Sequence, residues 1–250
     1  MQENKKNIYF ASDVHLGLPD FKKSLEREKL FVSWLDEIKN DAAAIYLLGD
    51  IFDFWFEYRN VVPRGFTRVL GKIAELTDIG IPVHFFRGNH DMWAFDYLPQ
   101  ETGCILHDGI LKIEFNGKKF YIAHGDGLGP GDYKYKFLRL IFKSSISHWL
   151  FARIHPNFGV GFANSWSHKS RKLQGAPSFH GEDKEWLILH AKNILKKEHF
   201  DYFIFGHRHI VLEFPLSEKS TYFNLGDWIN NFTYGVFDGE KMMLKKFRGK

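Results

Sequence analysis

The chain has 250 residues, 44% of them hydrophobic, a net charge of +4 at pH 7 and a single cysteine, Cys104. This length accommodates one large folded domain, and one cysteine excludes an intrachain disulfide, as fits a reducing compartment. The first residues lack the apolar core of a signal peptide, and no apolar run reaches the ~18 residues that a transmembrane helix needs. We therefore expect a cytoplasmic protein.

Unbroken apolar runs recur along the chain, and each ends in a polar cluster. Runs without polar alternation indicate strands buried on both faces. They lie at residues 7–11, 44–48, 83–86, 120–123, 202–205 and 221–224. Apolar stripes with helical spacing lie between several of them, at 30–38, 66–76 and 186–195. Strands that alternate with helices predict a layered α/β architecture, and we expect one domain over residues 1–250.

Residues 130–180 interrupt this alternation. The stretch is rich in proline and glycine and holds two helix-like pieces, near 132–143 and 149–154. We interpret it as a helical insertion that forms a cap over the site.

The polar clusters place acidic, amide and imidazole side chains next to glycine. The carboxyl ends of strands in an α/β sheet converge on one edge, so these side chains are expected to meet there. Five clusters supply candidate metal ligands: Asp13, His15, Asp50, Asn89, His124, His207 and His209. A mixture of carboxylate, amide and imidazole ligands suits Mn²⁺, Fe²⁺ or Zn²⁺ better than Ca²⁺ or Mg²⁺.

The spacing within the clusters indicates how the ions are shared. Asp13 and His15 are two residues apart in an extended segment, so both can bind one ion. A carboxylate at Asp50 can bridge two cations, whereas His207 and His209 reach different ions if their turn bends. Each pair alone is a weak signal, because a lone histidine is usually a core residue, but five clusters in this order predict a dinuclear centre. Nearby carboxylates are expected to hold loops or ligating imidazoles in place: Asp53, Asp126 and Asp227.

The order of these clusters resembles the pattern of calcineurin-like metallophosphoesterases. The resemblance spans about residues 7–228 and rests on Asp13-x-His15, Gly49-Asp50-x-x-Asp53, Gly88-Asn89-His90-Asp91, His124 and Gly206-His207-x-His209. It implies a four-layer α/β/β/α sandwich with two metal ions. By position, one ion would be bound by Asp13, His15, Asp50 and His209, and the other by Asp50, Asn89, His124 and His207. Every ligand position is filled, which argues against a non-catalytic scaffold.

A pair of divalent ions indicates hydrolysis of a phosphate ester or anhydride by an activated water. His90 follows the ligand Asn89 and is expected to point toward the substrate, where an imidazolium would stabilise developing charge or protonate the leaving oxygen. Asp91 is expected to orient His90 and raise its pKa. The alternative for His90 is a structural loop histidine.

The inserted stretch is strongly basic. Between residues 133 and 181 there are eight Lys and Arg and no Asp or Glu, an asymmetry that indicates an anionic partner or a solvated basic face. In a helix, Lys136, Arg139 and Lys143 share one face among bulky apolar residues. Such a helix suits an anionic membrane surface or an acylated substrate, and the alternative is a core-packing helix with a basic outer face.

Further residues resemble the UDP-2,3-diacylglucosamine diphosphatase family of lipid A biosynthesis. They are the run Gly49-Asp50-Ile51-Phe52-Asp53-Phe54-Trp55 and the spacing from His124-Gly125-Asp126 to Asp132-x-x-Tyr135. The resemblance implies cleavage of UDP-2,3-diacylglucosamine to UMP and 2,3-diacylglucosamine 1-phosphate, two Mn²⁺ ions, and a peripheral position on the inner face of the cytoplasmic membrane. By position, the substrate would be contacted by Asn89, His90, Asp132, Tyr135 and His207. Many members carry Arg in place of His90. For the family's substrate contacts later in the insertion, the sequence offers only candidates: Asn164, Ser167, Lys169 and Lys172.

Three other functions remain open from the sequence. Another calcineurin-like enzyme, such as a nucleotide phosphatase or phosphodiesterase, would not need an apolar insertion without acidic residues. A nuclease or nucleic-acid-binding protein would use the basic, aromatic stretch, but its apolar content is high and the total charge small, so no nucleic-acid partner is expected. A non-enzymatic interaction protein would not need the full ligand set.

Overall fold

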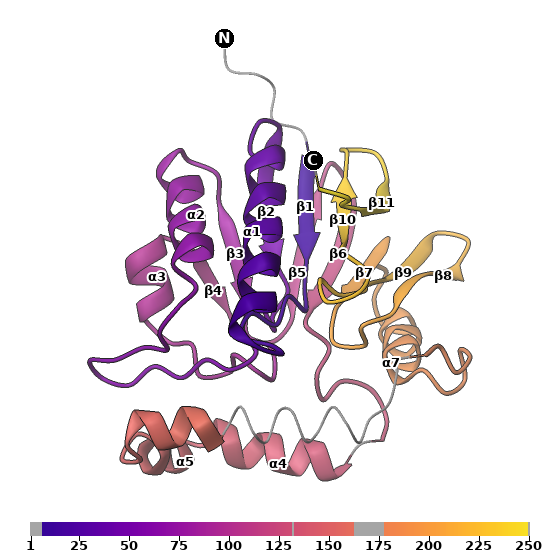
Figure 1. Ribbon diagram of the computed structural model, residues 1–250. Coiled ribbons are helices and arrows are strands. Elements are labelled where there is room, and N and C mark those ends of the chain that lie inside the picture. Colours follow the sequence, from indigo (N-terminus) through magenta and orange to yellow (C-terminus); the bar gives the residue numbers. More distant parts are fainter. Residues whose placement is uncertain (1–6, 132, 163–177, 250) are drawn as a thin grey trace.

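Two mixed β-sheets form the centre of the molecule (Figure 1). The computed structural model describes residues 7–131, 133–162 and 178–249. The six-stranded sheet has the order β11 (Met242–Lys246), β10 (Thr233–Phe237), β1 (Asn7–Ala11), β2 (Ala42–Leu47), β3 (Val83–Phe86) and β4 (Ile105–His107). The five-stranded sheet has the order β5 (Leu111–Phe115), β6 (Lys118–Ala123), β7 (Tyr202–Phe205), β9 (Ser220–Leu225) and β8 (Val211–Ser217).

Parallel pairing brings the functional loops to one end of the molecule. Strands β1 to β4 pair in parallel in the first sheet, and β6, β7 and β9 do so in the second. Their carboxyl ends therefore lie at one edge of each sheet, and Figure 1 shows both edges above the helices α4 (Tyr133–Lys143) and α5 (Ser145–Phe151). The polar clusters of the sequence follow these carboxyl ends.

Helices cover the outer faces of both sheets. α1 (Phe21–Ile38), α2 (Thr67–Asp78) and α3 (Tyr97–Thr102) pack on the first sheet, and α7 (Trp186–Leu195) packs on the second (Figure 1). α1 begins at Asp20, whose side chain accepts a 2.9 Å hydrogen bond from the backbone N–H of Lys23. This cap satisfies one of the N–H groups that a helix start leaves unpaired.

Three apolar layers hold the four structural layers together. Phe31 and Trp34 of α1 belong to the core between the first sheet and its helices. Phe10 and Phe120, whose rings lie 6.2 Å apart, belong to the core between the two sheets. Leu187 of α7 lies in the third core, against the second sheet. At about 1.5–3 kcal/mol for each large side chain that is fully buried, these layers supply the main stabilisation. The α/β/β/α arrangement expected from the sequence is confirmed.

The inserted helices lie across the end of the sheets that carries the polar loops. We call α4, α5 and the helical residues 156–162 the cap. Its aromatic contacts to the core include Phe151 against Phe56, with ring centres 4.6 Å apart. Trp93 adds a 2.9 Å hydrogen bond from its indole N–H to the carbonyl oxygen of Phe142. Among the described helices, none combines the length and apolar character needed to cross a bilayer.

The basic face of α4 points toward the core, which corrects the sequence-based interpretation. Lys136 donates a hydrogen bond to the carbonyl oxygen of Gly129, Arg139 pairs with Asp126, and Lys143 pairs with Asp108. The sequence-based alternatives are a helix that meets an anionic membrane or an acylated substrate and a core-packing helix with a basic outer face. The carboxylates of buried Asp126 and half-exposed Asp108 draw Arg139 and Lys143 inward, because a paired carboxylate at this boundary is more favourable than an unpaired one.

The outer face of α4 is consequently apolar. Phe137 and Leu140 expose 66% and 71% of their surface, and Tyr133 on the same side is also exposed. On α5, Ile146 and Trp149 are exposed as well. We call these five residues the apolar cap face. Large exposed apolar side chains that share one helix face mark a site of protein, membrane or ligand interaction.

Candidate metal centre

Six of the seven candidate ligands gather in two groups where parallel strands end. Asp13, His15 and His209 form one group, with their ligand atoms within 4.8 Å of one another. Asp50, His124 and His207 form the other within the same limit. The seventh candidate, Asn89, has its Oδ1 3.2 Å from Nε2 of His124. The structure thus brings together all seven side chains that the sequence singled out.

Asp50 lies between the two groups. Its Oδ2 is 3.4 Å from Nε2 of His124 and 3.7 Å from Nε2 of His15, while its Oδ1 accepts a 2.8 Å hydrogen bond from the backbone N–H of His90. Burial alone would raise the pKa of Asp50, but the positive charge of His124 lowers it well below its usual range. An ionised oxygen that faces imidazoles of both groups is placed to bridge two cations.

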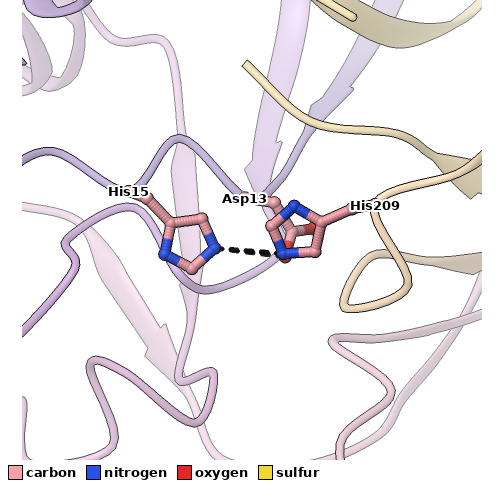
Figure 2. A group of neighbouring side chains, drawn as sticks. All are labelled: Asp13, His15 and His209. Carbon is pink, nitrogen blue, oxygen red and sulfur yellow. Dashed lines mark hydrogen bonds and ion pairs between the residues drawn. The ribbon is translucent and has the colours of Figure 1, made fainter. Parts of the chain in front are cut away.

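The first group has the donor set of a divalent cation site. Figure 2 shows the rings of His15 and His209 facing one another beside Asp13, with their Nε2 atoms 3.3 Å apart. Oδ1 of Asp13 lies 3.3 Å from Nε2 of His209, is buried and accepts no hydrogen bond from the described residues. Two imidazole nitrogens and a buried carboxylate oxygen that lacks a donor suit a borderline metal ion, so the residues present fit the group that the fold implies.

The ligand loops are held in a backbone conformation that side chains rarely adopt. In the described part of the chain, eight residues other than glycine have positive φ, and five of them are candidate ligands. These five are Asp13 (φ 56°), His15 (48°), Asp50 (53°), His207 (67°) and His209 (53°). The left-handed conformation costs about 1–2 kcal/mol per residue and persists only where the surroundings enforce it. Such strain clusters at functional sites, and here it turns the ligands inward.

The glycine before His207 is required by close packing. A Cβ atom at Gly206 would lie 2.5 Å from Oδ2 of Asp13 and 2.6 Å from Oγ of Ser12. The same Oδ2 accepts a 2.9 Å hydrogen bond from the backbone N–H of His207. A side chain at this position would push the His207 loop off Asp13, which explains the Gly-His pairing in the sequence.

Three ligand histidines have their Nδ1 atom engaged by an oxygen, which leaves Nε2 to face the centre. The pairs are His15 with Oδ1 of Asp53 at 3.3 Å, His124 with the carbonyl oxygen of Leu48 at 2.7 Å, and His209 with Oδ2 of Asp227 at 3.3 Å. An acceptor at Nδ1 fixes the ring orientation and the tautomer in which Nε2 carries the lone pair. The expected supporting roles of Asp53 and Asp227 are therefore present in the structure.

His90 contacts Asp53 rather than the neighbour that follows it in sequence. Its Nδ1 lies 2.7 Å from the carbonyl oxygen of Asp53, and its ring stands edge-on to His15 with centres 4.8 Å apart. His15, Asp53 and His90 form a further close group, but the contacts of both rings with Asp53 are made through Nδ1. We interpret this group as a brace for the two rings.

Asp91 has a different role from the one expected. Its carboxylate accepts hydrogen bonds from the backbone N–H groups of Gly88 (2.7 Å), Asp50 (3.2 Å) and Ile51 (2.9 Å). Burial, followed by the charge of Asp50, raises its pKa to about 7. Because the side chain turns back under the loops, Asp91 ties the Asn89 loop to the Asp50 loop instead of orienting His90.

Asp126 joins the centre to the cap. Its Oδ2 accepts a 2.9 Å hydrogen bond from the hydroxyl of Tyr135, whose ring centre lies 6.4 Å from that of His207. Tyr135 therefore reaches the edge of the centre. The remaining predicted contacts lie outside the described residues: Asp132, Asn164, Ser167, Lys169 and Lys172.

Arg27 is a supporting residue that sequence reasoning missed. It is buried on α1 and donates a 2.8 Å hydrogen bond to the carbonyl oxygen of His15. A second bond to the carbonyl oxygen of Leu18 closes the turn that follows the ligand. The helical spacing of the sequence could have indicated its burial, because Arg27 lies four residues before Phe31 and seven before Trp34 and so continues their buried stripe.

Comparisons with known proteins agree on a family. The family model described as calcineurin-like phosphoesterase matches residues 6–211. A relative from Porphyromonas gingivalis, named UDP-2,3-diacylglucosamine hydrolase, is 40% identical, over 96% of this chain and 97% of its own length. A protein with the same name from Vibrio vulnificus is 30% identical, over 76% of this chain and 72% of its own length. Another from Vibrio parahaemolyticus is 28% identical, over 88% of this chain and 89% of its own length.

Proposed function

The chain belongs to the calcineurin-like phosphoesterase family, and from that premise we propose that it hydrolyses the pyrophosphate of UDP-2,3-diacylglucosamine. The products would be UMP and 2,3-diacylglucosamine 1-phosphate. The observation that carries the reaction class is Asp50 between two groups of imidazoles, supported by the strained backbone at five of the seven candidate ligands. The substrate is supported by the 40% identical relative, whose alignment spans nearly the whole of both chains.

We assign two divalent ions to this centre and propose Mn²⁺, with Fe²⁺ and Zn²⁺ as alternatives. Asp13, His15, Asp50 and His209 would hold one, and Asp50, Asn89, His124 and His207 the other. When bound, such a pair activates a water for attack on phosphorus and neutralises charge on the phosphoryl oxygens. Burial lowers the pKa of His207 to about 4, so its imidazole is neutral and can serve as a ligand at neutral pH.

His90 is the proposed proton donor. Its Nδ1 faces the carbonyl oxygen of Asp53, so Nδ1–H is held in that hydrogen bond. In the protonated ring the other proton is on Nε2, and that proton would be donated to the leaving oxygen. Its backbone N–H meanwhile holds Oδ1 of Asp50, which ties the position of the donor to that of the bridging ligand.

The cap is the proposed binding surface for the acylated part of the substrate and for the membrane. Proposed substrate contacts are Asn89, His90, Asp132, Tyr135 and His207. The apolar cap face supports peripheral binding to the inner face of the cytoplasmic membrane, because it offers aromatic and aliphatic side chains to the acyl region, with Lys134 beside them for anionic headgroups.

One assay tests the proposed reaction. The Mn²⁺-loaded protein is incubated with UDP-2,3-diacylglucosamine in mixed micelles, and UMP release is followed. Cleavage of bis(p-nitrophenyl) phosphate, a water-soluble diester, is measured separately as the alternative reaction. Strong UMP release with weak diester cleavage is expected. Equal or greater activity on the soluble diester would instead identify a general phosphodiesterase on the same core.

A further inference from the structure

A pocket opens beside His209, next to the first ligand group. It lies between the start of β8, the loop after β9 and residues 178–179, which precede α7. Its volume is about 420 Å³, within the range of about 300–1,000 Å³ typical of small-molecule sites. Asp227, the partner of His209, also lines it. Whatever fills this pocket therefore lies directly against the candidate metal centre.

The walls combine an aromatic ring with amide groups. Phe179 exposes 44% of its surface, and Ile210 adds apolar surface. Asn230 and Asn231, from the loop that follows β9, also line the pocket, and the amide of Asn231 donates a 3.2 Å hydrogen bond to the carbonyl oxygen of His209. Nucleobases bind proteins by stacking on aromatic faces, while hydrogen-bonding groups read their edges. The chemistry of these walls fits a base with an attached sugar.

The wall that carries Phe179 is anchored to the ligand loop. Arg208, between His207 and His209, donates a hydrogen bond of 3.4 Å to the carbonyl oxygen of Ser178. Its guanidinium also pairs with the buried Glu185 at 2.6 Å. The ring of Phe179 lies 6.3 Å from that of Phe214 on β8. These contacts fix the aromatic wall relative to the ligand histidines.

We propose that this pocket binds the uracil and ribose of the substrate, an inference that rests on the function proposed above. A diphosphate that reacts between the two ligand groups must extend one end to each side. Tyr135 and Asp126 join the cap to the His207 side, which leaves that side to the acylated sugar. The nucleoside end then passes His209 and meets Phe179, with Asn230 at the edge of the base.

The pocket is tested by calorimetric titration of the Mn²⁺-loaded protein with UMP and with ribose 5-phosphate. Both carry the same phosphate and ribose, and only UMP carries the base. UMP is expected to bind about tenfold more tightly or better to the wild type. Phe179→Ala should remove most of this preference, Phe179→Trp should retain it, and Asn230→Ala should reduce it. Asn193→Ala, an exposed amide on α7, is the matched control.

The outcomes separate the pocket from the proposed function. Equal binding of UMP and ribose 5-phosphate overturns the pocket, even if the UDP-linked lipid is cleaved. A UMP preference that survives both Phe179→Ala and Asn230→Ala also overturns it. A preference that depends on Phe179, in a protein that does not cleave the lipid, upholds the pocket and overturns the proposed substrate. Phe179→Ala should also raise KM for the lipid about tenfold while kcat changes little.

Discussion

The guanidinium Nε of Arg139 lies 2.5 Å from Oδ2 of Asp126, and this ion pair joins the cap to a loop of the metal centre. Arg139 belongs to α4, whereas Asp126 is buried two residues after the candidate ligand His124. Tyr135 donates to the same oxygen from one helical turn earlier. The orientation of α4 over the site is therefore set by a carboxylate that moves with a ligand loop.

Replacing Arg139 by Gln should loosen the cap. The variant loses a partly buried ion pair, and the buried carboxylate of Asp126 is left without its cationic partner. This is expected to cost about 1–3 kcal/mol of stability. It should also raise KM for the lipid substrate, because Tyr135 is no longer held near His207. Thermal unfolding and proteolysis between the cap and the core measure the first effect, and steady-state kinetics the second. Lys134→Gln removes the same charge from an exposed position of the same helix and should leave stability unchanged.

The orientation of α4 shows what the sequence alone could not supply. The amphipathic pattern of Lys136, Arg139 and Lys143 predicts a helix with one basic face, and that helix is present. Its pattern does not say which face meets the core, because the answer depends on carboxylates distant in sequence, such as Asp108 and Asp126. The apolar face turned outward for the same reason.

Disrupting the apolar cap face should separate membrane binding from chemistry. The double variant Phe137→Glu, Leu140→Glu places two charges on exposed positions, so folding should be little affected. We expect binding to vesicles that contain anionic phospholipid to fall at least tenfold in a flotation assay, since acidic groups oppose both burial and the surface potential. Hydrolysis of bis(p-nitrophenyl) phosphate should remain at the wild-type rate.

Ile79→Glu is the control for this surface. Ile79 is also exposed, but it lies at the end of α2 just before β3, at the edge of the sheet opposite the carboxyl ends. Vesicle binding by this variant should equal that of the wild type. An equal loss in both variants would show that general charge, rather than the cap, governs binding.

Asp227→Asn should weaken the hold on one ion without unfolding the loop. Oδ1 of Asp227 accepts the backbone N–H groups of residues 229–231, and an asparagine oxygen can keep those bonds. An amide N–H facing Nδ1 of His209 would favour the wrong tautomer, and such changes cost about 10–100-fold in metal affinity. Elemental analysis after dialysis should show partial metal loss, and activity should return with excess Mn²⁺.

Asp50→Ala gives the contrasting result. A ligand shared by both groups serves both ions, so this variant should lose most metal and most activity, and excess Mn²⁺ should not restore turnover. If Asp50→Ala turns over like the wild type, the assignment of the centre is wrong. If Asp227→Asn is as damaged as Asp50→Ala and is not rescued, Asp227 acts on more than His209.

The metal ligands were predictable from the sequence because strand ends converge. The residues that hold these ligands in place were predictable only in part. Unbroken apolar runs located every parallel strand except β4, and hence every ligand loop. The edge strand β8 was missed because its exposed and half-buried residues alternate and it contains Pro215, which only an edge strand tolerates. The position of Asp91 next to His90 in sequence predicts a contact between the two side chains, but the carboxylate of Asp91 points to the loop of Asp50.

The histidine pair His84 and His107 should make stability depend on pH away from the metal centre. Nδ1 of His84 lies 2.8 Å from Nε2 of His107, and the His84 ring stacks on Tyr46 with centres 4.3 Å apart. Burial, then the charge of His107, lowers the pKa of His84 from 6.5 to about 4. The unfolded chain therefore binds a proton that the folded chain rejects, so this stability is present above pH 6.5 and lost as pH falls toward 4.

Because the pair is only half-buried, solvent screening reduces the effect to about 1–2 kcal/mol. Urea unfolding at pH 7.0 and pH 5.0 measures it as a difference between the wild type and His84→Phe, a variant that keeps the flat ring against Tyr46 and cannot be protonated. Titration of the metal-site histidines is common to both proteins and cancels in that difference. The variant should lose less stability than the wild type on acidification, and an identical loss would place the acid sensitivity elsewhere in the molecule.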